Sequence, residues 1–255
     1  MCLILLVWRA HPEFPCVLAA NRDEFHARAT AAANWWPDRP SVLAGRDLEA
    51  GGTWLGVTRA GRIAALTNYR DPGLVRDSVP SRGDLVTQFL ESSQSVADAL
   101  EHLRRVGGSY NPFNIIFSDG ERLGIFESVR GDGRELGAGV YGLSNHLLDT
   151  PWPKVRIAKS RLTEALNSLH DETAVMRLLR DDKPAPDDEL PQTGITLQWE
   201  RLVSSAFVRA GAYGTRCSTL LRIGRAGRAA FDEWSWDRDG LESGRKSFQF
   251  QLQST

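Results

Sequence analysis

The sequence predicts an α+β fold in which antiparallel sheets carry helices on their outer faces. The first observation is the order of segments: strand-like apolar runs and amphipathic helical segments come in blocks, as strands, helices, strands, helices and strands again. Such blocks are typical of α+β proteins, whereas α/β proteins alternate the two types one by one. The second observation is that short turns join successive strands, which indicates hairpins rather than parallel crossover units.

The first block of strands begins with an apolar hairpin at the N-terminus. We expect strands over residues 2–8, 16–20, 51–58 and 62–67. The polar string Asn21-Arg22-Asp23-Glu24 directly follows the second of these runs and marks its end, either as an exposed turn or as part of a site. Residues 26–50, with Trp35-Trp36-Pro37 in the middle, predict an irregular loop.

Amphipathic periodicity predicts the helices. We expect them over residues 81–90, 96–106, 153–166 and 172–179. Ser81 is the expected N-cap of the first, with Asp84 three residues on, and Gly107 ends the second. The remaining strands are expected over residues 113–117, 123–128, 139–143, 202–209, 216–223, 229–236 and 247–252. Residues 181–191 are rich in Pro and Asp and predict a loop that could hold a domain boundary.

Composition excludes several classes of partner. The formal net charge is −1 over 255 residues, so no bulk field favours nucleic acid or an anionic membrane. The apolar run 2–8 is too short for a signal peptide or a membrane span. The three cysteines are widely spaced and form no metal-binding pattern, so we expect a reducing, cytoplasmic location and neither a metal nor a cofactor.

The first two residues, Met1-Cys2, are the strongest chemical signal. Removal of Met1 would leave Cys2 as the N-terminus, with a thiol nucleophile and an α-amine whose pKa of about 8 suits a base. An N-terminal nucleophile activated by its own amine is an established catalytic arrangement. The alternative is that Cys2 is an ordinary small apolar residue that begins a buried strand.

Polar residues recur at strand ends elsewhere in the chain. They are Asn21-Arg22-Asp23-Glu24, Thr67-Asn68, Ser144-Asn145 and Thr215-Arg216. Strand ends from one sheet edge can meet, so these side chains can converge on a single rim beside Cys2. A Cys–His dyad that uses His146, next to Asn145, is an alternative source of a base.

At this point the chain resembles the NRDE family, whose eukaryotic members are called transport and Golgi organisation protein 2. The resemblance is carried by Met1-Cys2-Leu3, Ala20-Asn21-Arg22-Asp23-Glu24-Phe25, Gly51-Gly52-Thr53-Trp54-Leu55-Gly56, Leu66-Thr67-Asn68-Tyr69-Arg70, Leu143-Ser144-Asn145 and Tyr213-Gly214-Thr215-Arg216. These segments span nearly the whole chain, so the resemblance implies one domain over residues 1–255.

The family in turn is similar to N-terminal-nucleophile (Ntn) cysteine hydrolases of the penicillin V acylase and bile salt hydrolase type. That similarity implies a four-layer αββα sandwich of two antiparallel sheets with helices on the outer faces. It also implies roles for six residues: Cys2 as nucleophile, Arg22 and Asp23 to orient and polarise its amine and thiol, Asn68 and Asn145 as oxyanion contacts, and Arg216 as a distal arginine. Those hydrolases space their Arg and Asp three positions apart, whereas Arg22 and Asp23 are adjacent, so the acting acid is either Asp23 or Glu24.

Two functions follow as hypotheses. The first is an amidohydrolase that cleaves an amide or thioester with an apolar acyl group through an acyl-Cys2 intermediate, with a small molecule as substrate. The second is non-enzymatic binding and trafficking of a hydrophobic small molecule such as haem or acyl-CoA, in a pocket lined by some of the eight tryptophans.

Overall fold

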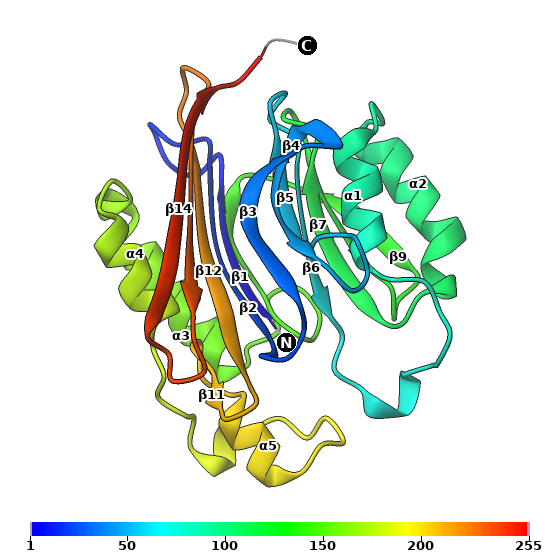
Figure 1. Cartoon of the computed structure of the whole chain (residues 1–255), viewed down its shortest axis with the longest axis vertical. Coiled ribbons are helices and arrows are strands. Elements are labelled where there is room, and N and C mark those ends of the chain that lie inside the picture. Colours follow the sequence, from blue (N-terminus) through cyan, green and yellow to red (C-terminus); the bar gives the residue numbers. More distant parts are fainter. Residues whose placement is uncertain (1, 254–255) are drawn as a thin grey trace. The chain divides into compact units, whose positions relative to one another are not determined.

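The computed structural model describes residues 2–253 and divides into two compact units. Unit 1 holds residues 1–27 and 138–249, and unit 2 holds residues 28–137 and 250–255. Each unit contains one seven-stranded sheet with helices against it (Figure 1). The predicted α+β class with two antiparallel sheets is confirmed. The single-domain assignment stays a prediction, and the division does not fall in the 181–191 loop.

The sheet of unit 1 joins the N-terminal hairpin to strands from the far end of the sequence. Its order is β10 (Gly139–Leu143), β1 (Cys2–Trp8), β2 (Cys16–Phe25), β12 (Tyr213–Ile223), β13 (Arg228–Trp236) and β14 (Glu242–Gln251), with the short β11 (Arg209–Ala210) beside β12. The pairs from β10 to β13 are antiparallel. This topology places β1 and β2 inside a sheet whose remaining strands begin more than 110 positions after β2 ends.

Helices cover one face of this sheet. They are α3 (Pro153–Glu164) and α4 (Glu172–Leu179), with the short α5 (Leu197–Leu202) near β11 (Figure 1). Alternate residues of β1 supply Leu3, Leu5 and Val7 to the core under α3 and α4, because successive side chains of a strand point to opposite faces. Cys2 and Ile4 therefore belong to the sheet face that is turned away from these helices.

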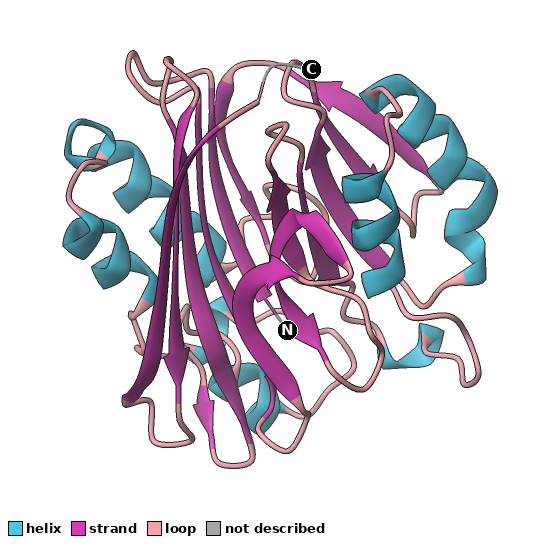
Figure 2. Ribbon diagram, turned by 45° about the horizontal axis from the view of Figure 1, so that its top comes forward, coloured by secondary structure: helices cyan, strands magenta, loops and turns pink. Residues whose placement is uncertain are grey.

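The sheet of unit 2 is a meander in chain order. Its strands are β3 (Thr30–Trp36), β4 (Arg39–Asp47), β5 (Leu55–Thr58), β6 (Ile63–Asn68), β7 (Phe113–Ser118), β8 (Leu123–Glu127) and β9 (Asp132–Leu136). Helices α1 (Gly83–Glu91) and α2 (Val96–Val106) pack on one face of this sheet (Figure 2). Phe89 of α1 lies in one core with Phe117 of β7 and Phe126 of β8. Single 3-10 turns occur at Pro72–Leu74, Gly107–Ser109, Leu166–Ser168 and Asp187–Glu189. None of the helices within residues 2–253 has both the length and the apolar character needed to cross a membrane.

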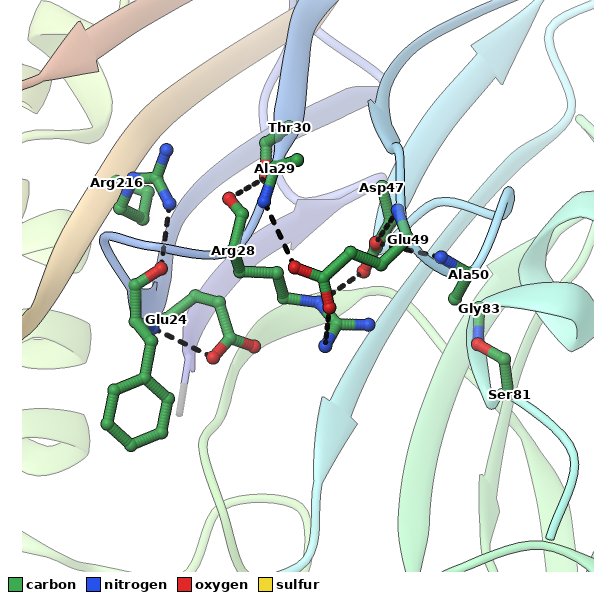
Figure 3. A network of polar contacts seen from close by, with 11 residues as sticks. Glu24, Arg28, Ala29, Thr30, Asp47, Glu49, Ala50, Ser81, Gly83 and Arg216 are labelled. Atoms are coloured by element: carbon green, nitrogen blue, oxygen red, sulfur yellow. Dashed lines mark hydrogen bonds and ion pairs between the residues drawn. The ribbon is translucent and has the colours of Figure 1, made fainter. Parts of the chain in front are cut away.

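Residues 26–50 form the hairpin β3–β4, so the predicted loop is wrong. Trp36 is buried, its indole N–H donates to Ala44 O at 3.0 Å, and the Arg46 guanidinium lies 4.3 Å from its ring. At the other end of the hairpin, Arg28 Nε donates to Asp47 Oδ2 at 2.7 Å (Figure 3). These polar and cation–aromatic contacts stabilise strands that hold only one β-branched residue each, Thr30 and Val42.

Three other predictions of local structure need correction. The strand expected over residues 202–209 is wrong: α5 ends at Leu202, and the following apolar residues fill a small core with Tyr213. The strand β9 was not predicted. The first helix begins after Arg82 rather than Ser81, although Ser81 Oγ still accepts from Gly83 N at 3.3 Å.

Candidate active site

Cys2 is the first residue of β1 and pairs directly with Arg22 of β2. Directly paired residues of antiparallel strands point to the same face, with Cβ atoms about 5 Å apart. Arg22 is 5% exposed and therefore keeps its guanidinium inside the protein, next to the half-buried Cys2 thiol. The two residues that the sequence analysis placed at the centre of the site are thus neighbours across one strand pair.

The polar string around Arg22 is part of strand β2 rather than a turn after it. Asn21, Arg22 and Asp23 are all buried, and β2 continues to Phe25. Because side chains alternate along a strand, Arg22 and Glu24 share the face of Cys2, whereas Asn21 and Asp23 take the opposite face. The four adjacent polar residues therefore face two different sides of the sheet.

Asp23 is held by β12. Its Oδ1 accepts a hydrogen bond of 2.7 Å from Thr215 Oγ1, and its backbone O accepts one of 2.9 Å from Tyr213 Oη. The backbone N–H of Asp23 donates to the sulfur of Cys2. Glu24, the other candidate acid, accepts at Oε1 from the neighbouring Phe25 N–H at 2.8 Å. Asp23 thus touches Cys2 through its backbone, while its carboxylate bonds to Thr215.

Asn145 and Ser144 hold the backbone of Cys2. Asn145 is fully buried, and its Oδ1 lies 3.4 Å from Cys2 N as an acceptor. Ser144 Oγ donates to Cys2 O at 2.8 Å. The strand-end pair Ser144-Asn145 therefore meets Cys2, as the sequence analysis expected, and Ser144 adds a contact that it did not assign.

Arg216 sits at an irregularity of β12. The register shifts between Thr215 and Cys217, so Arg216 is the extra residue of a β-bulge. Its Nη1 donates to Phe25 O at 2.8 Å (Figure 3). Burial lowers the pKa of Arg216, and the positive charge of Arg22 lowers it further. The two arginines therefore lie within electrostatic range of each other at one end of the sheet.

Asn68 and His146 are the remaining candidates. Asn68 ends β6 in unit 2, opposite Phe113, and its role toward Cys2 stays a prediction. His146 Nδ1 lies 2.8 Å from Thr150 Oγ1, and its ring packs against Trp152. Within residues 2–253, no three His, Cys, Asp or Glu side chains gather as they would around a metal ion.

Neighbouring groups shift the pKa of the Cys2 thiol both upward and downward. Burial raises the pKa of the Cys2 thiol, and the negative charge of Asp23 raises it further. The positive charge of the N-terminal amine, the Asp23 backbone N–H and the Arg22 charge lower this pKa, because all three stabilise a thiolate. The net pKa lies above the usual value, so the resting side chain at neutral pH is a thiol that needs a base.

Two residues beside Arg22 were missed by the sequence analysis. Cys217 of β12 pairs with Arg22 on the side opposite Cys2, and Glu233 of β13 lies next to Cys217. Both are interior positions of apolar strands, where no strand-end signal marks them. The one available signal was the pair of acids, Asp232-Glu233, inside an otherwise apolar run.

Comparison with known proteins places these residues in a family. The family model described as Transport and Golgi organisation 2 matches residues 1–238. A Transport and Golgi organization protein 2 homolog from Bos taurus is 37% identical over 100% of both chains. The Transport and Golgi organization protein 2 of Drosophila melanogaster is 30% identical over 91% of both chains.

Solved structures extend the comparison to the fold. A variant of conjugated bile acid hydrolase from Clostridium perfringens matches with a TM-score of 0.51 and 9% identity, over 100% of this chain and 98% of that one. The similarity lies in the fold alone, and it confirms the predicted Ntn-hydrolase-like fold class.

Proposed function

The chain belongs to the Transport and Golgi organisation 2 family, and we propose that it is an N-terminal cysteine hydrolase. Its substrate would be a small molecule with an amide or thioester bond and an apolar acyl group, and its intermediate an acyl-Cys2 thioester. The protein of similar fold is a conjugated bile acid hydrolase. The proposal depends on the residues of this chain, since a shared fold does not by itself carry an activity.

One observation carries the proposal: two segments distant from each other in the sequence, β2 and the pair Ser144-Asn145, hold Cys2. Arg22 lies beside its side chain, Asn145 Oδ1 faces its nitrogen at 3.4 Å, and Ser144 Oγ donates to its carbonyl at 2.8 Å. A cysteine that only filled the start of a strand would need no buried arginine and no buried carboxamide. These contacts fix the nitrogen and the sulfur of one residue in a polar setting, as an N-terminal nucleophile requires.

The chemical steps follow from these positions. After loss of Met1, the Cys2 amine accepts the thiol proton while the sulfur adds to the substrate carbonyl. The amine then returns this proton to the leaving amine or thiol, and the C–N or C–S bond breaks to leave an acyl thioester. Water, deprotonated by the same amine, attacks the thioester, releases the acid and restores the thiol.

The other candidate residues support these steps. Arg22 stabilises the developing thiolate, and Asn145 orients the amine through its Oδ1. Asp23 fixes this arrangement through its backbone N–H and its bond to Thr215. We assign the oxyanion contacts to the carboxamides of Asn68 and Asn145, each typically worth about 3–4 kcal/mol. Arg216 adds a second positive charge at this end of the sheet, which favours a substrate with an anionic or polar group.

The first prediction tests the nucleophile. We expect intact-mass spectrometry to show a protein lacking Met1, because Cys2 is small enough for aminopeptidase to act. Turnover of a panel of N-acyl amides and acyl thioesters, with acyl chain length varied, should fall at least 10³-fold in Cys2→Ala. Cys16→Ala is the matched control, because it removes a buried thiol from the same sheet but leaves Cys2 in place.

The same experiment separates the outcomes. Wild-type protein incubated with a thioester substrate and quenched in acid should gain one acyl mass on the peptide that begins with Cys2. Complete retention of Met1 would remove the free amine from the mechanism. Equal turnover by Cys2→Ala would remove Cys2 from it. The proposed cytoplasmic location suits this chemistry, because it keeps the thiol reduced.

A second candidate function is binding of a hydrophobic small molecule, and a cavity of unit 2 favours it. The cavity has a volume of about 470 Å³ and lies between α1 and α2, with Phe89 of α1 and Ile115 and Phe117 of β7 in its lining. This size suits a small ligand. Phenylalanine and His102 supply the aromatic part of the described lining, rather than the tryptophans that the sequence analysis expected around a ligand. Titration of haem and of acyl-CoA by calorimetry, with Ile115→Trp to fill the cavity, tests this function.

A further inference from the structure

Strand β1 extends past its pairing with β10 at the end that carries Cys2. The ladder between β1 and β10 ends at the pair Ile4–Leu143, whereas the ladder between β1 and β2 continues to the pair Cys2–Arg22. On the β10 side of β1, Cys2 therefore lies beyond the last pair. Other groups must hold the backbone of Cys2 on this side.

The side chains of Ser144 and Asn145, which directly follow β10, take the place of the ladder. Ser144 Oγ donates to Cys2 O at 2.8 Å, and Asn145 Oδ1 accepts from Cys2 N at 3.4 Å. Both residues are buried. Ser144 Oγ also lies 3.3 Å from Asn145 Oδ1, but a hydroxyl has one proton, and the shorter distance assigns this proton to Cys2 O.

These two contacts show which way the backbone of Cys2 points. The N–H and C=O groups of a strand residue point to the same side, and those of Cys2 point to the β10 side. Cys2 and Arg22 are therefore a non-hydrogen-bonded pair, in which the side chains lie closer together. Strand β2 thus contacts the side chain of Cys2. Among the residues that the structure describes, Ser144 and Asn145 supply the hydrogen bonds to its backbone.

Loss of Met1 would make the contact with Ser144 more important. Cys2 would then be joined to the chain by a single peptide bond, and chain ends fray unless they are tied down. The amine and the sulfur both extend from the Cα of Cys2, and the hydrogen bond to Cys2 O fixes the peptide plane that carries this Cα. A tilt of the plane moves both reactive atoms, and a displacement of about 1 Å can slow a reaction about 100-fold.

We propose that Ser144 is a positioning residue of the active site. Its hydroxyl holds the carbonyl of the N-terminal Cys2, and thereby keeps the amine beside Asn145 and the sulfur beside Arg22. The inference rests on the proposed function, because it assumes that Cys2 attacks a substrate carbonyl. It assigns Ser144 no contact with the substrate, so Ser144 acts through Cys2.

The test compares variants of position 144 that keep or lose the hydroxyl. Ser144→Ala removes it, whereas Ser144→Thr and Ser144→Val have nearly the same shape and differ in the hydroxyl. The measured quantity is the rate at which the N-acetylcysteamine thioester of octanoic acid acylates Cys2, read by peptide mass spectrometry after an acid quench. We expect acylation to be about 10- to 100-fold slower in Ser144→Ala than in the wild type, and at least about 10-fold slower in Ser144→Val than in Ser144→Thr.

Alkylation of Cys2 by iodoacetamide from pH 6 to 10 separates positioning from damage to the fold. Alkylation needs a thiolate but forms no oxyanion that must be aligned with donors. Fraying exposes the sulfur, and burial is the largest cause of the raised pKa of the Cys2 thiol. Alkylation at pH 8 should therefore be unchanged or faster in Ser144→Ala. Cys16 is buried in the same sheet and should stay unreactive in every variant.

Ser205→Ala is the matched control. Ser205 is buried in unit 1, and its Oγ donates to Phe207 O at 2.7 Å, so the substitution removes the same kind of hydrogen bond from another carbonyl. Both reactions of Cys2 should keep their wild-type rates in this variant. Amide hydrogen exchange adds a reading that needs no substrate: residues 2–6 should exchange faster in Ser144→Ala, whereas residues 213–223 of β12 should exchange as in the wild type.

Four results would overturn the inference. They are wild-type acylation by Ser144→Ala, equal acylation by Ser144→Thr and Ser144→Val, acylation and alkylation that slow together, and unchanged exchange of residues 2–6 in Ser144→Ala. A wild-type protein that iodoacetamide alkylates at Cys2 but the thioester does not acylate would instead contradict the proposed function. Hydrogen exchange then still decides whether Ser144 holds Cys2, so the two failures are distinguishable.

Discussion

At the scale of single residues, the three cysteines show how neighbours decide what burial does. Burial raises the pKa of each thiol. For Cys16, burial alone accounts for the shift and raises the pKa of the thiol to about 12. Cys2 differs because the N-terminal amine, the Asp23 backbone N–H and Arg22 all favour its thiolate. A reactive cysteine therefore needs a specific cationic or N–H partner as well as a place in the sheet.

The raised pKa of Cys16 makes a prediction about stability. Above pH 9 the unfolded chain ionises this thiol while the folded chain keeps it neutral, so the unfolded state binds fewer protons and stability falls as pH rises toward about 12. Cys16 is 2% exposed, so its contribution approaches about 1.4 kcal/mol for each pH unit in this window. Urea unfolding at pH 8, 9, 10 and 10.5 should show a shallower decline for Cys16→Ala than for wild type. Equal slopes would contradict it.

The site could be predicted from the sequence only where its residues adjoin an apolar run. Cys2, Arg22 and Asn145 each stand at or near a boundary between apolar and polar residues, and the structure brings these three together. Glu233 and Cys217 are interior strand residues, and only the register across β2, β12 and β13 makes them neighbours of Arg22. Register depends on pairing between distant segments, which local patterns do not contain.

At the scale of elements, the polar string of strand β2 contributes to the site on one face of the sheet and to helix packing on the other. Arg22 points to the face of Cys2, whereas Asn21 points to the face of the helices. Asn21 Nδ2 donates to Leu179 O at 2.7 Å and to Ala206 O at 2.8 Å, and its Oδ1 accepts from Ser218 Oγ at 2.6 Å. Asn21 therefore ties the end of α4 and the segment before β11 to the sheet.

This geometry predicts that Asn21→Ala destabilises the protein without changing Cys2. The substitution leaves buried backbone carbonyls and a buried hydroxyl without their partner, which costs about 2–4 kcal/mol. Thermal unfolding should show the loss, while the pH profile of Cys2 alkylation stays that of the wild type at a temperature where both proteins are folded. Asn34→Ala, at an exposed strand position, is the control and should change stability by less than about 0.5 kcal/mol. A shifted Cys2 profile in Asn21→Ala would assign Asn21 to the site instead.

Element type could be predicted where the local pattern and the tertiary contacts agree. The hairpins of β5–β6 and β7–β8 and the helices α2 and α4 have regular apolar periodicity, and they lie within a few residues of their predicted bounds. The β3–β4 hairpin did not show this pattern, because arginine–tryptophan contacts and ion pairs stabilise it. Those contacts join residues whose pairing is visible only once the hairpin has formed.

At the scale of the whole molecule, the two sheets differ in how far apart in sequence their paired strands lie. In unit 2 the strand order follows the chain order from β3 to β9. In unit 1, β1 pairs with β10, as Leu6 does with Tyr141, and β2 pairs with β12, as Asn21 does with Ser218. Closing such long loops costs conformational entropy before the contacts repay it, so sequence-distant pairing slows folding.

This difference predicts that unit 2 acquires protected strands before unit 1 during refolding. After dilution from denaturant, pulsed hydrogen exchange read by mass spectrometry should protect β5–β8 before β1, β2 and β12. The hairpins of unit 2 need only nearby partners, whereas β1 and β2 must wait for residues 213–223. Simultaneous protection of both sheets would mean that pairing of β2 with β12 belongs to the folding nucleus, and earlier protection of β1 and β2 would contradict the prediction. In the first case, the segments that carry Cys2, Arg22 and Cys217 would assemble as early as the local hairpins.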